Sequence, residues 1–127
     1  MVKNNETTNA FLIHLSAFIG YLFPFGGIVI PLVLWKSQKE KSEFLDRHGK
    51  EAVNFNITYG LYEISMIIAI CLSFWGSIVL QGSISFVFLI TSFVLFQIIR
   101  IVLILLAATK AKKGEEYTYP FTINFIK

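Results

Sequence analysis

Long stretches of this sequence lack charged residues. No Asp, Glu, Lys or Arg occurs between Ala10 and Trp35 or between Ile64 and Gln97, and a further uncharged run, Ile101–Thr109, follows Arg100. Uncharged apolar runs of about 20 residues are typical of membrane-spanning helices. The chain has 127 residues, 55% of them hydrophobic, and a water-soluble domain of this size has no interior large enough for that share. The sequence therefore predicts one membrane domain.

Motifs for common chemistry are lacking too. We find no cluster of metal-ligating side chains, no nucleophile placed near a base and no glycine-rich phosphate loop. The one cysteine, Cys71, lies inside an apolar run and cannot form an intramolecular disulfide. The first apolar run is too long for a signal peptide and has no A-x-A-like cleavage site. We expect a protein that is not an enzyme and holds no cofactor or metal.

The expected fold is all-α and polytopic, with three membrane-spanning helices over about 10–35, 52–80 and 83–109. Gln81-Gly82 supplies the turn between the last two spans, 36–51 forms a charged connector and 110–127 an extended tail. The basic residues of the connector and the tail then face one side, which the positive-inside rule places in the cytoplasm. This predicts an inner-membrane protein with its N-terminus outside and its C-terminus in the cytoplasm. Basic residues that flank spans among acidic ones do not indicate nucleic-acid binding.

The first span is broken by prolines. Pro24 removes the hydrogen bond to the carbonyl of Gly20, Pro31 does the same to Gly27, and Gly26 lies between them. Freed carbonyls at membrane depth are tolerated only against protein or in a wet cavity, so we expect this span to pack inside a bundle or an oligomer. A kinked span is the favoured interpretation. A re-entrant loop, which puts the N-terminus inside, is the alternative, and the glycines also suit close helix packing.

Two charged residues interrupt the later spans at matched depth. Glu63 lies 18 residues before Gln81, and Arg100 lies 18 residues after Gly82. In an antiparallel hairpin these positions are level, so we predict an ion pair, with Gln97 one turn away. The favoured interpretation is a lock that holds the hairpin in register. Snorkelling of Arg100 to the headgroups and a polar transport pathway are the alternatives.

The tail and two histidines complete the candidate sites. Aromatic and aliphatic residues alternate with polar ones over Tyr117–Phe125, which predicts an extended segment. We interpret Tyr117, Tyr119, Pro120 and Phe121 as part of an interfacial anchor, with a partner-binding strand as the alternative. His14 is expected to hydrogen-bond a neighbouring helix, and a proton relay is the alternative. His48 and Glu51 are expected to cap the second span.

Three blocks, HLSAFIGYLFPFGGIVIPLVLW, SEFLDRHGKEAVNFNITYGLYE and AATKAKKGEEYTYPFTINFIK, cover most of the chain. Together they resemble small bacterial membrane proteins related to the Tic-twenty component of the chloroplast protein import machinery. The polar signature residues of this resemblance are His14, His48, Glu51 and Asn54. The resemblance implies a translocon-like or conduit-supporting role and no catalytic residues.

The expected function is therefore that of a non-enzymatic integral membrane protein. It acts in the lipid bilayer as a homo-oligomer or as an accessory subunit of another membrane protein. Two other classes stay open. A small transporter or channel predicts flux that depends on Glu63, and an immunity-type protein predicts altered sensitivity to an antimicrobial peptide.

Overall fold

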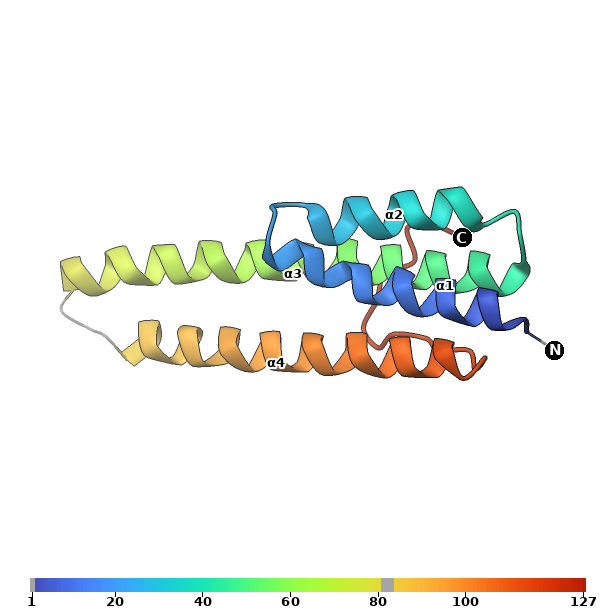
Figure 1. The fold of residues 1–127 in the computed structure, drawn as a ribbon. Coiled ribbons are helices and arrows are strands. Elements are labelled where there is room, and N and C mark those ends of the chain that lie inside the picture. Colours follow the sequence, from blue (N-terminus) through green and yellow to red (C-terminus); the bar gives the residue numbers. More distant parts are fainter. Residues whose placement is uncertain (1, 81–83) are drawn as a thin grey trace.

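A long antiparallel hairpin of α3 (Glu43–Leu80) and α4 (Ile84–Lys112) is the frame of the molecule (Figure 1). The computed structural model describes residues 2–80 and 84–127, so the predicted turn at Gln81 and Gly82 and the predicted start of the third span at residue 83 lie outside the described residues. Among the described residues two helices, Glu43–Val79 and Phe86–Lys112, are long and apolar enough to cross a membrane.

The first apolar run does not form one kinked helix over 10–35, and the prediction of three spans is not confirmed. Helix α1 (Asn4–Leu15) continues into the 3-10 helix η1 (Ser16–Tyr21), and after a tight turn α2 (Gly26–Gln38) runs back beside it (Figure 1). The turn places Phe25 in the left-handed region with φ 63°, where non-glycine residues are uncommon. The segment is thus a helical hairpin, which is closer to the re-entrant alternative than to a kinked span.

Glycines allow this hairpin to close. A Cβ atom on Gly20 would lie 3.0 Å from the Cα atom of Gly27, and a Cβ atom on Gly26 would lie 3.0 Å from the carbonyl oxygen of Ile19. Side chains at these positions would force the two arms apart. The glycines and Pro24 therefore lie where the chain reverses, whereas Pro31 lies inside α2.

The N-terminus consequently lies at the same end as the C-terminus, contrary to the predicted topology (Figure 1). Lys112 Nζ at the end of α4 donates a hydrogen bond to Thr8 Oγ1 of α1 at 2.7 Å. The charged connector is also shorter than the predicted 36–51, because α3 begins at Glu43. Ser42 caps this helix: its Oγ accepts a hydrogen bond from the backbone N–H of Leu45 at 3.3 Å.

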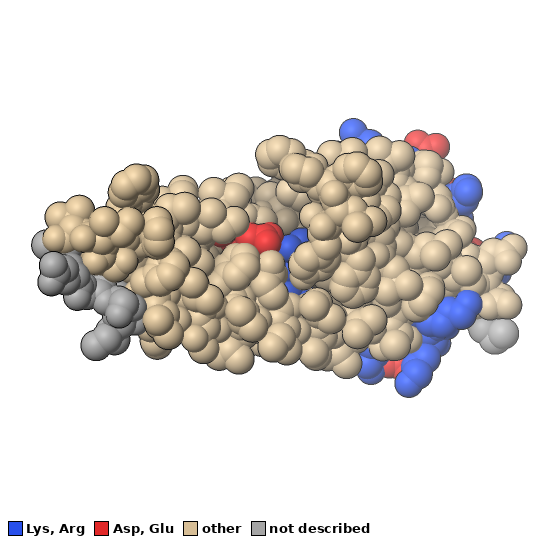
Figure 2. All heavy atoms as spheres, turned by 60° about the vertical axis from the view of Figure 1, so that its left-hand side comes forward, with Lys and Arg blue, Asp and Glu red and all other residues tan. Residues whose placement is uncertain are grey.

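The core occupies only the half of the hairpin that α1 and α2 cover. Its fully buried hydrophobic residues include Ile13 of α1, Phe55 of α3 and Ile104 of α4. Towards the other end, large apolar side chains such as Leu72 and Phe88 are 68% and 69% exposed, as expected for surfaces that face lipid. Figure 2 shows the charged residues gathered at the end with the core and one acidic and one basic group within the apolar surface.

Candidate functional site

The charged groups within the apolar surface are Glu63 and Arg100, the only charged residues between Ala52 and Thr109. Arg100 Nη1 donates to Glu63 Oε2 at 2.8 Å, and Gln97 Nε2 donates to Glu63 Oε1 at 2.8 Å. The Arg100 side chain is only 7% exposed. The structure therefore brings together the three side chains that the register of the hairpin predicts to be level.

The depth of this cluster follows from the helix rise. Arg100 lies 16 residues after Ile84, which is about 24 Å along α4 at about 1.5 Å per residue. A hydrocarbon core is about 30 Å thick. Placing the start of α4 at one boundary of this core puts the ion pair about 6 Å inside the other boundary. This second boundary falls near Gly60 of α3.

The tip of the α1–α2 hairpin covers the ion pair. A Cβ atom on Gly27 would lie 3.4 Å from Arg100 Nη2, and a Cβ atom on Gly20 would lie 3.9 Å from it. The Tyr21 ring centre lies 5.4 Å from the guanidinium carbon, a cation–π distance. The two glycines thus leave room for the Arg100 guanidinium beside the Tyr21 ring. Pro24 lies in the turn beyond it, and Pro31 is buried inside α2.

A second polar group joins α1, α3 and the tail inside the core. His14 Nδ1 lies 2.9 Å from the Tyr119 hydroxyl, and His14 Nε2 lies 2.8 Å from His48 Nδ1. The three side chains are almost completely buried, and burial raises the pKa of the Tyr119 hydroxyl well above its usual range. His14 thus bonds a neighbouring helix as predicted, whereas His48 packs in the core and does not cap α3.

The tail docks along one face of α3. Glu51 Oε2 accepts a hydrogen bond from the Tyr119 backbone N–H at 3.1 Å, and Asn54 exchanges two 2.9 Å hydrogen bonds with the backbone of Ile126. Farther along, Thr58 Oγ1 accepts from the N–H of Ile123 at 3.0 Å and the Tyr62 hydroxyl donates to the Phe121 carbonyl at 3.1 Å. Side chains of α3 thus pair with the backbone of an extended segment that has no strand partner within residues 2–80 and 84–127.

Thr58 and Tyr62 were not among the predicted site residues. The signal was available, because Glu51, Asn54, Thr58 and Tyr62 follow one another at three or four residues, the spacing of one helix face. The interfacial-anchor prediction does not fit Tyr119, which is 3% exposed and stacks on Phe55 with ring centres 3.8 Å apart. Phe121 is 85% exposed.

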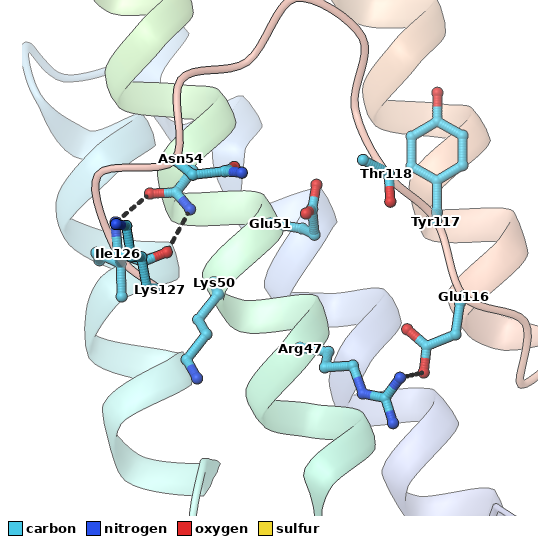
Figure 3. A pocket seen from close by; sticks show the side chains of 10 residues that line it. Arg47, Lys50, Glu51, Asn54, Glu116, Tyr117, Thr118, Ile126 and Lys127 are labelled. Atoms are coloured by element: carbon cyan, nitrogen blue, oxygen red, sulfur yellow. Dashed lines mark hydrogen bonds and ion pairs between the residues drawn. The ribbon is translucent and has the colours of Figure 1, made fainter.

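A cavity of about 520 Å³ lies between the tail and α3 at the charged end (Figure 3). Its lining mixes both signs of charge, with Arg47 and Lys50 on α3 and Glu116 on the tail. Arg47 Nη1 lies 3.8 Å from Glu116 Oε1, an ion pair that ties the start of the tail to α3. Figure 3 shows Asn54 closing the other side of the cavity with its hydrogen bonds to Ile126.

Comparison with known proteins gives one family. The model of the MamF/MmsF family, described as the magnetosome magnetite crystal formation protein family, matches residues 5–126. No curated protein and no solved structure matches the chain. The resemblance to relatives of the Tic-twenty component was therefore wrong. The three blocks that suggested it lie in the α1–α2 hairpin, in the first half of α3 and in the end of α4 with the docked tail. These segments pack against one another, and their packing does not indicate a translocon.

Proposed function

We propose, since this chain belongs to the magnetosome magnetite crystal formation protein family, that it is a non-enzymatic accessory protein of the bacterial inner membrane or of a compartment derived from it. It serves crystal formation through contacts made at its charged end. The observation that carries this proposal is the placement of the charged residues and the docked tail at one end of a hairpin that elsewhere exposes apolar side chains.

The sign of the charge suggests what this end contacts. Outside the Glu63–Arg100 pair the chain has ten basic and seven acidic residues. Four of the acidic ones, Glu43, Asp46, Glu115 and Glu116, are in ion pairs. The remaining excess is positive, which favours anionic headgroups or an acidic protein surface over the collection of metal cations. We therefore place this end at the cytoplasmic face, in contact with a membrane-protein partner or a second copy.

Complementation tests this role. A magnetosome-forming bacterium that lacks its own member of the family receives this chain, and crystal dimensions are measured by electron microscopy. We expect recovery of crystal size with the unaltered chain. A matched variant exchanges Lys110, Lys112 and Lys113 for glutamine and should reach the membrane without restoring size. Normal membrane insertion of the unaltered chain with no effect on crystals would contradict the proposal.

A further inference from the structure

A groove opens on the flank of α3 beside the tip of the α1–α2 hairpin. It encloses about 450 Å³. Four of its lining residues, Asn56, Gly60, Ile64 and Ile67, follow one another at three or four residues along α3, so they share one face of the helix. The groove therefore follows the axis of α3 for about 16 Å at about 1.5 Å per residue.

The two ends of the groove differ in polarity. Asn56 and the ion pair of Glu63 and Arg100 line the part towards the charged end, whereas Ile64 and Ile67 line the part towards the middle of the hairpin. Because the boundary of the hydrocarbon core falls near Gly60, the groove begins about 6 Å outside this boundary and reaches about 10 Å inside it. Asn56 thus lies at the level of lipid ester groups, and Arg100 Nη2 reaches to 3.4 Å from its Oδ1 from just inside the boundary. Ile64 and Ile67 lie at the level of acyl chains.

Arg100 has hydrogen-bonding capacity to spare in this groove. A guanidinium carries five N–H bonds. The structure gives this one a 2.8 Å partner in Glu63 and a long 3.4 Å contact with Asn56 Oδ1, and Arg100 Nε has no partner among the described residues. Nη2, which has only the long contact with Asn56, therefore keeps hydrogen-bonding capacity for a ligand oxygen.

Gly60 makes the groove hollow. A Cβ atom added there would have one neighbour within 4 Å, Ile28 Cδ1 of α2 at 3.7 Å. A larger side chain would extend into the space between α2 and α3. Replacing Gly60 with a larger residue therefore fills the groove without removing a polar contact.

We propose that this groove binds one glycerophospholipid, with an acyl chain along Gly60–Ile67 and an ester or phosphate oxygen at Arg100. The orientation matches that of the surrounding bilayer, because the polar end of the groove faces the charged end of the molecule.

Bound lipid can be counted on the intact protein. Wild type, Gly60→Leu and the control Gly76→Leu are purified in a maltoside detergent and analysed by native mass spectrometry. Gly76 lies on the same helix, and a Cβ atom there would meet nothing within 4 Å. We expect one phospholipid per chain in wild type and in Gly76→Leu, and at least tenfold less in Gly60→Leu at unchanged helix content.

Two further arms make the result decisive. Phosphatidylglycerol added to delipidated protein should raise the melting temperature of wild type but not of Gly60→Leu. If Gly60→Leu does not fold, Ile28→Trp fills the same groove from α2 and carries the same expectation. Wild type without lipid, or equal retention by wild type and the filled groove, would overturn the proposal and leave only ordinary boundary lipid.

Discussion

Replacing Arg100 with leucine should destabilise the protein strongly, and replacing Glu63 as well should restore it. In Arg100→Leu the Glu63 carboxylate loses its 2.8 Å partner and keeps only the hydrogen bond from Gln97. Removing one member of a buried ion pair costs about 3–5 kcal/mol, because the remaining charge is uncompensated. Glu63→Leu should cost a similar free energy, because it leaves the charge of Arg100 uncompensated and the Arg100 side chain is only 7% exposed.

The double variant Glu63→Leu/Arg100→Leu removes both charges at once. Apolar replacement of a whole buried pair is often neutral, so its free energy of unfolding should lie within about 1 kcal/mol of wild type. With each single loss at about 3 kcal/mol or more, the coupling energy between the two sites is then at least about 5 kcal/mol. Unfolding by titration with a denaturing detergent in micelles, followed by circular dichroism, measures all four proteins.

The control is Leu95→Ala, on the outer face of α4, where the side chain is 55% exposed. It should change the free energy of unfolding by less than about 1 kcal/mol. If the double variant instead loses the sum of the two single losses, Glu63 and Arg100 act independently and the pair does not hold the hairpin in register.

Three other variants test the packing of the half of the molecule that α1 and α2 cover. Gly49→Ala should lower the free energy of unfolding by about 1–3 kcal/mol. Its Cβ atom would lie 2.0 Å from Trp35 Cδ1 and displace a ring whose Nε1 donates to Asp46 at 2.9 Å. Chemical unfolding measures this loss, and a loss equal to that of Gly76→Ala would contradict the contact. Asn54→Leu removes both hydrogen bonds to Ile126 and should increase carboxypeptidase cleavage of the tail about tenfold, since each bond contributes about 0.5–1.5 kcal/mol; unchanged cleavage would mean that the tail is held elsewhere. Tyr119→Phe leaves His14 Nδ1 without its 2.9 Å partner and should lower the free energy of unfolding by about 1–3 kcal/mol, whereas Tyr117→Phe, near the surface, should have little effect.

The level placement of Glu63 and Arg100 could be predicted from the sequence because an α-helix has a constant rise. Counting residues from a turn gives depth without knowledge of any contact. Counting residues failed for the first apolar run. Because the chain reverses there, the number of residues no longer gives the depth in the membrane. Pro24 and the glycines indicate that a helix breaks, but they do not indicate in which direction it continues.

The hydrogen-bond partners of the tail could not be predicted from the sequence either. Alternation over Tyr117–Phe125 predicts an extended segment, but its hydrogen-bond partners are side chains of α3 that lie more than 50 residues earlier. The sequence of the tail does not indicate which helix face supplies these hydrogen-bonding side chains. His14 and His48 likewise come together only because α1 packs against α3.

By itself, the sequence determined that this is a helical membrane protein with a charged end and one ion pair at matched depth. Local hydropathy and helix rise suffice for these properties, because each depends on a continuous stretch of chain. Only the tertiary structure decided that the first apolar run returns, that both termini share one end, and that the tail closes over α3. These depend on which surfaces fit together, above all on the contact of Gly20 with Gly27, which no local pattern specifies.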